Sequence, residues 1–228
     1  MPAFDQVVGR KTMPLDAERL AAAARAAAAV ALDIGTGDGR FVLDTARAHP
    51  DWLVVGIDPV AENMARSARL AAGKLAKGGA PNACFLRASI EQLPGPLAAT
   101  ADRATVNYPW GSLLRIMATA EVDVLRQLRA TCKHGAALTV LLNYAVFEDR
   151  EYLQRLGLGA IEDLEHDEKF SAAYAAAGFS IHTRRIFTGD PPVRTQWGRQ
   201  LVRGSDRPTL MIEAVADLGA ASETPRGS

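Results

Sequence analysis

Two short segments contain aromatic side chains that could hold a planar ring. Trp110 lies in the segment NYPWGS (107–112), just past an apolar stretch, and Trp197 lies in the polar segment TQWGR (195–199). The glycine-rich segment DIGTGDG (33–39) follows the first apolar stretch of the chain. Glycine lets a turn close tightly around a ligand, and flat aromatic faces bind nucleic-acid bases by stacking. If the three segments meet in the fold, they would form a base-binding clamp beside a cofactor turn.

The charges around the glycine turn indicate what kind of cofactor it could bind. A dinucleotide-binding turn has the spacing G-x-G-x-x-G, which rests a pyrophosphate on a helix N-terminus. Here Gly35, Gly37 and Gly39 alternate, and Asp33 and Asp38 add negative charge that would repel a pyrophosphate. A cofactor with an ammonium and a sulfonium fits better, and the spacing resembles the first motif of class I S-adenosylmethionine (SAM) methyltransferases. A glycine turn with no ligand is the alternative.

Acidic residues after the next two apolar stretches are further candidate cofactor ligands. Asp58 is followed by Pro59, and its carboxylate could accept both ribose hydroxyls of a nucleoside cofactor. A helix N-cap at Asp58 is the alternative, and the two roles are compatible. In class I methyltransferases the loop that matches Ser89-Ile90-Glu91 faces adenine, so Ile90 could pack on that ring with Glu91 nearby. A solvent-exposed Glu91 is the competing interpretation.

The elements that would position these residues alternate along the chain, with apolar strands followed by amphipathic helices. Such alternation predicts an α/β fold, a mostly parallel sheet with helices on both faces, which binds ligands outside the carboxyl ends of its strands. We expect seven strands, at 30–34, 53–57, 83–87, 104–107, 137–142, 179–187 and 209–216. We expect helices at 16–29, 39–49, 62–75, 113–132, 148–156 and 167–177.

This arrangement predicts one domain, residues 1–218, followed by a small, polar tail at 219–228 that we expect to be disordered. The loops after the strands would bring the glycine turn, Asp58, Glu91, Trp110 and Trp197 to one edge of the sheet. Asp38 and Ser112 stand where the N-caps of two of the predicted helices should be. Trp52, near the start of the second strand, is expected in the core, and a purely structural role is the alternative for the other two tryptophans.

The composition limits the possible classes of protein. The 228 residues include 26 basic and 26 acidic side chains, so binding to nucleic acid must depend on a local patch. Cys84 and Cys132 are expected to be free buried thiols. We find no metal-ligand motif, no nucleophile elbow, no secretory leader and no apolar run of membrane-spanning length. We therefore expect a cytoplasmic protein with no catalytic metal and no membrane or DNA partner.

A local basic patch surrounds Trp197. Between residues 181 and 208, six arginines against two aspartates leave a net charge of +4. Arginine suits contact with phosphate, and solvated surface charge is the alternative for each residue. The candidate RNA-binding residues are Arg184, Arg194, Arg199, Arg203 and Arg207, extended by Arg10, Lys11, Lys74 and Lys77.

The segment NYPW resembles the Asn-Pro-Pro-aromatic motif of methyltransferases that act on amino groups of bases, with Tyr108 in place of the first proline. The longer run PWGSLL (109–114) is more specific. Together with the glycine turn, KGG (77–79) and T-x-W (195–197), it resembles the kanamycin–apramycin resistance methyltransferases, which modify N1 of adenine-1408 in 16S rRNA. The resemblance covers about residues 7–215, and the acidic segment 147–168 departs most from the family.

The resemblance implies a class I SAM methyltransferase fold with a short N-terminal hairpin at residues 1–14. It also implies a monomer that methylates the assembled 30S subunit and confers aminoglycoside resistance. Trp110 and Trp197 would stack on the two faces of the flipped adenine. Thr195 would help to position the base or the loop that carries Trp197. Asn107 could orient the substrate or the cofactor. The candidate cofactor-binding residues are Asp33, Gly35, Thr36, Gly37, Asp38, Asp58, Pro59, Ser89, Ile90, Glu91 and Asn107.

Methylation at N1 makes particular chemical demands. Adenine N1 carries a lone pair and no proton at neutral pH, so the enzyme needs alignment and exclusion of water rather than a general base. N1 lies on the pairing edge, so the base must leave its stack. A tryptophan face also favours the positive charge of the product. A methyltransferase of tRNA or of a small molecule, and an inactive SAM- or RNA-binding module, are the alternatives.

Overall fold

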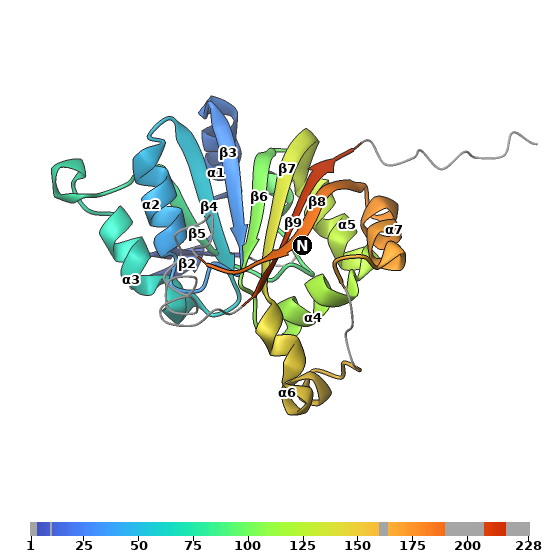
Figure 1. Cartoon of the computed structure of the whole chain (residues 1–228). Helices are drawn as coiled ribbons and strands as arrows, with labels where there is room; N and C mark the ends of the chain where they lie inside the picture. Colours follow the sequence, from blue (N-terminus) through green and yellow to red (C-terminus); the bar gives the residue numbers. More distant parts are fainter. Residues whose placement is uncertain (1–3, 10, 160–163, 190–207, 218–228) are drawn as a thin grey trace, which may run out of the picture.

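The structure is a computed structural model that describes residues 4–9, 11–159, 164–189 and 208–217. A central sheet is covered by helices on both faces (Figure 1). Within the described residues the sheet has nine strands in the order β2-β1-β5-β4-β3-β6-β7-β9-β8. The α/β fold expected from the alternating pattern is confirmed.

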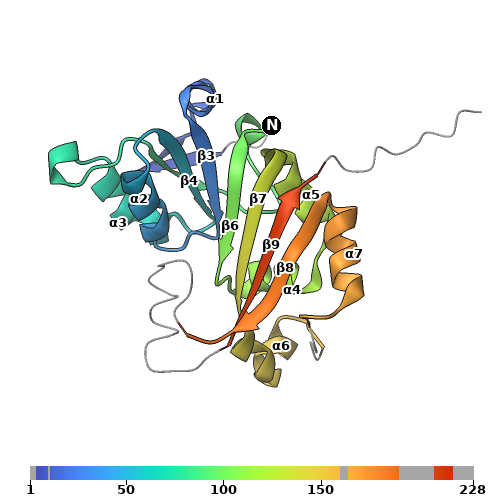
Figure 2. The same ribbon diagram turned by 45° about the horizontal axis from the view of Figure 1, so that its top comes forward.

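The centre of the sheet is parallel. Its five strands are β5 (Ala83–Arg87), β4 (Trp52–Asp58), β3 (Ala29–Ile34), β6 (Ala101–Asn107) and β7 (Cys132–Asn143). β9 (Thr209–Ala216) then pairs antiparallel with β7 and with β8 (Phe179–Phe187). From β3 the strand order continues outward to β4 and β5, and from β6 it continues in the opposite direction to β7 (Figure 2). The carboxyl ends of β3 and β6 therefore form the switch point, where such sheets bind ligands.

The seven expected strands and the N-terminal hairpin are all present, but the hairpin extends the sheet, which therefore has nine strands within the described residues. β1 (Asp5–Val8) and β2 (Lys11–Pro14) pair with each other, and β1 pairs antiparallel with β5. An ion pair between Asp5 and Arg87 ties the hairpin to the end of β5. Without the hairpin, β5 would be an edge strand with unpaired backbone groups, so the addition is physically favourable.

The helices form two layers. They are α1 (Ala17–Ala26), α2 (Arg40–Ala48), α3 (Ala61–Ala71), α4 (Gly111–Thr119), α5 (Val122–Thr131), α6 (Arg150–Arg155) and α7 (Glu168–Ala176). Short 3-10 turns are η1 (Leu75–Lys77), η2 (Gly95–Leu97) and η3 (Tyr144–Glu148). Val54 packs in the cluster formed with α2 and α3, whereas its neighbours Leu53 and Val55 pack in the cluster with α1, α4, α5 and α7. Alternate residues of the strands therefore bury apolar surface on both faces.

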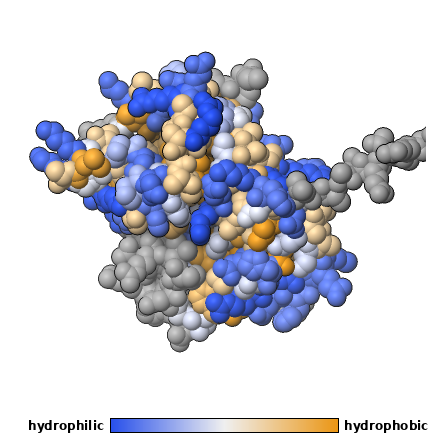
Figure 3. Space-filling view, turned by 90° about the horizontal axis from the view of Figure 1, so that it is seen from above, coloured by the Kyte–Doolittle hydropathy of each residue, from blue (hydrophilic) through white to orange (hydrophobic). Residues whose placement is uncertain are grey.

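The surface is mixed in polarity. On the face shown in Figure 3, hydrophilic and hydrophobic residues occur in small neighbouring groups. Trp52 is only partly buried, and it stacks on His49 with ring centroids 3.9 Å apart. Both cysteines are free and buried, as expected, and burial raises the pKa of Cys132 to about 11. No helix within the described residues is long and apolar enough to cross a membrane.

The predicted helix at 113–132 is wrong, because the structure divides it into α4 and α5. Ala120 ends α4 in the left-handed region with φ of 50°, and Cys132 begins β7 instead of ending a helix. The segment has no proline, and its apolar residues keep a helical period on both sides of Ala120. Tertiary packing has overridden local preference here.

Two predicted caps are also wrong. Asp38 accepts the N–H of Arg40 at 3.1 Å, but the N-cap of α2 is Gly39, with φ of 69°. A Cβ on Gly39 would lie 2.6 Å from Cε1 of Phe85, so this close approach requires glycine. Ser112 lies inside the first turn of α4, whose N-cap is Trp110. The predicted tail at 219–228 lies outside the described residues.

Candidate active site

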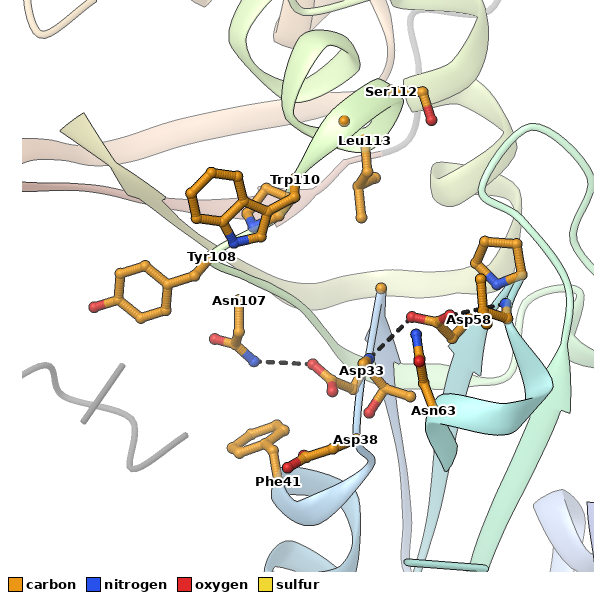
Figure 4. A pocket seen from close by; sticks show the side chains of 17 residues that line it. Asp33, Asp38, Phe41, Asp58, Asn63, Asn107, Tyr108, Trp110, Ser112 and Leu113 are labelled. Carbon is orange, nitrogen blue, oxygen red and sulfur yellow. Dashed lines mark hydrogen bonds between the residues drawn. The ribbon is translucent and has the colours of Figure 1, made fainter. Parts of the chain in front are cut away.

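A cleft of about 710 Å³ lies at the switch point of the sheet (Figure 4). Its walls come from the loop after β3, the loop after β4, and the loop that joins β6 to α4. The structure thus brings together most of the residues predicted to bind a cofactor. Those that line the cleft are Asp33, Gly35, Thr36, Gly37, Asp38, Asp58, Pro59 and Asn107.

Asp33 is the most deeply buried acid of the cleft, with 2% of its surface exposed. Its Oδ1 accepts hydrogen bonds from the Thr105 hydroxyl at 2.8 Å and from Nδ2 of Asn107 at 2.9 Å. Burial raises the pKa of Asp33 to about 6, and these hydrogen bonds act in the opposite direction. A cation beside Asp33 would stabilise the charged carboxylate, so the site favours a cationic ligand group.

One buried polar atom beside Asp33, Oδ1 of Asn107, has no hydrogen-bond partner within the described part of the chain. Because Nδ2 of Asn107 donates to Asp33, its Oδ1 is left as an acceptor. Buried polar groups in proteins are nearly always paired, so this oxygen indicates a place where a ligand donates a hydrogen bond.

Asp58 joins the glycine turn to the start of α3. Its Oδ2 accepts the N–H of Gly37 at 3.0 Å, and its Oδ1 accepts the N–H of Val60 at 2.9 Å. Burial raises the pKa of Asp58, while hydrogen bonds from the Val60 and Gly37 backbone and from the Asn63 side chain lower it. The carboxylate therefore organises the backbone locally. Its predicted role toward ribose hydroxyls stays a prediction.

Leu113 closes the cleft over the glycine turn. A Cβ on Gly35, whose φ is 70°, would lie 2.4 Å from Cδ2 of Leu113, so the turn requires glycine here. A second cavity of about 40 Å³ adjoins the cleft, since Gly35 and Leu113 line both. Ser89, Ile90 and Glu91 line this smaller cavity. Ile90 is buried and Glu91 is exposed, and their contact with a cofactor ring stays a prediction.

Tyr108 explains why this chain departs from the Asn-Pro-Pro-aromatic pattern. Its φ is 50°, and its backbone N–H donates to the carbonyl oxygen of Leu141 at 2.8 Å. Proline can provide neither this φ nor an N–H. The Tyr108 ring is 3% exposed and packs with Leu141 and Met211, which anchors the loop to β7 and β9. Trp110, two residues later, lines the cleft and is 45% exposed.

Trp197, the second predicted aromatic face, and Thr195 both lie outside the described residues. This segment lies between β8 and β9 in the sequence. Phe187, the last residue of β8, pairs with Thr209, the first residue of β9. Thr209 in turn pairs with Asn143 at the carboxyl end of β7. The described chain therefore leaves and re-enters the sheet at the edge that carries the cleft. The roles of Trp197 and Thr195 stay predictions.

The candidate RNA-binding residues are not all close to the cleft. Arg184 donates to the backbone oxygens of Glu165 at 2.7 Å and Asp167 at 2.8 Å, which gives its guanidinium a structural role. Lys74 and Lys77 are exposed in the connection that leads into the amino end of β5, and Lys11 begins the outermost strand, β2. None of these four lines the cleft. Outside the described residues lie Arg10, Arg194, Arg199, Arg203 and Arg207.

The sequence did not predict several residues of the site. Phe41 and Asn63 line the cleft from the first turns of α2 and α3, and Leu113 covers the glycine turn. Tyr152 contacts Trp110 from α6, with ring centroids 5.7 Å apart. The position of Leu113 in the PWGSLL run was an available signal. Nothing in the local sequence indicates the contact of Tyr152, because it lies 41 residues from Gly111, to which it is hydrogen-bonded.

A sheet with a parallel centre, whose switch point carries a glycine turn and a cleft lined by acids, is typical of class I SAM-dependent methyltransferases. The NpmA family model, described as 16S rRNA (adenine(1408)-N(1))-methyltransferase, matches residues 5–216 of the chain. The chain belongs to this family.

Individual relatives agree with the family match. A 16S rRNA (adenine(1408)-N(1))-methyltransferase of Streptoalloteichus hindustanus is 38% identical over 181 residues, which cover 78% of this chain and 82% of that protein. The crystal structure of the aminoglycoside resistance methyltransferase NpmB1 has a TM-score of 0.82 at 37% identity, covering 93% of this chain and 99% of that one. A tryptophan-to-alanine mutant of the Catenulisporales acidiphilia 16S rRNA (adenine(1408)-N(1))-methyltransferase, with cosubstrate SAM, has a TM-score of 0.84 at 34% identity, covering 99% and 100%.

Proposed function

We propose that this protein transfers the methyl group of SAM to N1 of adenine-1408 in the 16S rRNA of the 30S subunit, and that this modification confers resistance to kanamycin and apramycin. The observation that carries the proposal is the position of Trp110 on the same cleft as the Asp33–Asn107 pair. Family membership, and the names of the relatives, support the choice of 16S rRNA as the substrate.

The described residues fit SAM as the cosubstrate. The buried Asp33 carboxylate would hold the ammonium group, and the unpartnered Oδ1 of Asn107 would accept a hydrogen bond from the ligand. Asp58 would accept the ribose hydroxyls, and Ile90 would pack on the adenine ring. SAM supplies a methyl group bound to a positively charged sulfur. The carboxylate of Asp33 therefore matches the positive charge of the ligand's ammonium group.

Trp110 provides the aromatic face beside this cofactor cleft. Its indole is nearly half exposed, although large aromatic side chains are usually buried. A base flipped out of the RNA could stack on this face, and Trp197 is proposed as the opposite face. Because N1 needs no deprotonation, the protein's part in catalysis is to hold the base in line with the methyl group and to exclude water.

The target can be tested by incubating the protein with labelled SAM and, separately, with 30S subunits, naked 16S rRNA and tRNA. We expect label in 30S subunits and a primer-extension stop at adenine-1408. Label in tRNA alone, or a stop at another nucleotide, would contradict the proposal. Cells that express the protein should also survive kanamycin and apramycin, and cells that express Trp110→Ala at the same level should not.

A further inference from the structure

Tyr152 makes two contacts with the loop that carries Trp110. Its hydroxyl oxygen accepts the backbone N–H of Gly111 at 3.0 Å. Its ring meets the Trp110 ring edge-on, with centroids 5.7 Å apart and an interplanar angle of 68°. Figures 1 and 2 both show α6, which carries Tyr152, beside α4, which Trp110 precedes. The two contacts therefore fix a backbone group and an aromatic ring at consecutive positions.

The hydrogen bond satisfies a group that would otherwise lack a partner within the helix. Gly111 is the first residue of α4, and Trp110, the N-cap, makes no side-chain capping bond. The first N–H groups of a helix have no partner within it, so they need an external acceptor. Tyr152 provides that acceptor from a different element. Tyr152 thus contributes both to the cap of α4 and to the orientation of the Trp110 ring.

Tyr152 is itself held in place by its own helix. Its backbone N–H donates to the side chain of Asp149 at 2.9 Å, which caps α6. Leu153, the next residue, is 2% exposed and packs in the main core. The guanidinium of Arg155 lies 5.7 Å from the centroid of the Tyr152 ring. A side chain anchored in this way can restrict a neighbour that is 45% exposed, as Trp110 is.

We propose that Tyr152 is a positioning residue that sets the plane of the Trp110 indole against which the target base stacks. Tyr152 does not line the cleft, so it acts through Trp110 rather than on the substrate. The catalytic part of this inference rests on the proposed function. The structural part, that Tyr152 restricts the motion of Trp110, is independent of the proposed function and can be measured without RNA.

The first test measures Trp110 directly. In a Trp52→Phe/Trp197→Phe background the remaining indole fluorescence comes from Trp110 alone. Tyr152→Leu removes both contacts, and Tyr152→Phe removes only the hydrogen bond. We expect acrylamide quenching to rise and anisotropy to fall for Tyr152→Leu, with a smaller change for Tyr152→Phe. Unchanged fluorescence in a Tyr152→Leu protein that melts at the parent temperature would overturn the inference.

The second test measures turnover on 30S subunits in the chain with all three tryptophans. We expect kcat to fall about 10-fold or more for Tyr152→Leu and roughly 2- to 10-fold for Tyr152→Phe, as loss of an aromatic contact and a hydrogen bond would produce. The Kd for SAM should stay within about twofold, because the cofactor residues are untouched. Tyr174→Phe is the matched control, since it removes a hydroxyl from α7, away from Trp110, where the hydroxyl makes only a long contact of 3.9 Å with the Met117 sulfur. It should keep full kcat.

The outcomes separate the two proposals. If fluorescence changes but kcat of Tyr152→Leu equals that of the parent, the positioning role in catalysis is wrong. A fall in kcat for Tyr174→Phe equal to that for Tyr152→Phe would also overturn it, since the effect would not be specific to Trp110. If the parent itself methylates no 30S subunit, the proposed function fails, while the fluorescence result still decides whether Tyr152 restricts Trp110.

Discussion

Nδ2 of Asn107 lies 2.9 Å from the buried Oδ1 of Asp33, and this hydrogen bond joins the ends of two strands that are adjacent in the sheet but 74 residues apart in sequence. The bond fixes the orientation of the Asn107 amide and leaves its oxygen as an acceptor in the cleft. It also holds a carboxylate in a place where burial makes ionisation unfavourable. The pair therefore prepares the cleft for a ligand that brings both a positive charge and hydrogen-bond donors.

Replacing Asp33 by Asn should stabilise the ligand-free protein at neutral pH while weakening SAM binding. The pKa of Asp33 is about 6 in the folded protein, above its ordinary value of 3.8. A raised folded-state pKa gives stability that is present in full below pH 4 and is lost as the pH rises through 6. Removing the charge should recover up to about 3 kcal/mol at pH 8. Urea denaturation at pH 5 and pH 8 measures this difference, and a less stable variant at pH 8 would contradict it.

SAM binding should depend on pH through the same carboxylate. If the ionised Asp33 holds the ammonium group of SAM, its protonation below pH 6 should raise the Kd by about tenfold per pH unit. Calorimetric titration between pH 5 and pH 8 would show the change. The Asp33→Asn variant is the control, since its weaker binding should vary little over that range. An equally steep profile in both proteins would assign the dependence to another group.

Tyr108→Pro should disrupt the fold of the Trp110 loop, although proline occurs at this place in the related motif. The change removes the hydrogen bond from Tyr108 N–H to Leu141 and forbids the observed φ of 50°. We expect a loss of about 3 kcal/mol or more in the free energy of unfolding. Tyr108→Phe is the matched control and should lose at most about 1 kcal/mol, since the hydroxyl contact with Thr209 is long, at 3.4 Å. Equal stability of both variants would refute this account.

Trp110→Ala should abolish methyl transfer to 30S subunits with little change in SAM affinity. Loss of one stacking face removes about 1–3 kcal/mol of base binding and the alignment that depends on it. Trp110→Phe should retain part of the activity, because it keeps a smaller aromatic face. Trp52→Phe, whose ring stacks on His49 away from the cleft, should behave as the parent. Single-turnover rates and SAM titrations distinguish these results, and full activity of Trp110→Ala would remove Trp110 from the mechanism.

Much of the fold and of the cofactor cleft follows from local patterns in the sequence. Apolar runs predicted β3, β4, β5 and β6 to within three residues, because burial on both faces of a parallel sheet leaves a strong signal, whereas β7 begins five residues before its predicted start. The parallel order then required the glycine turn, Asp58 and Trp110 to share one edge, and the structure brings them to one cleft. The sequence could specify these features because each depends on residue type and on its place in an element.

Other features depend on contacts between residues far apart in the chain, which no local pattern encodes. The break at Ala120 and the pairing of the hairpin with β5 are products of packing between elements. The raised pKa of Asp33 comes from the neighbours that bury it, and the support of Trp110 comes from Tyr152 on a helix 41 residues beyond Gly111. Burial and hydrogen bonding across such separations arise only once the chain has folded, so the chemistry of the cleft was decided by tertiary structure.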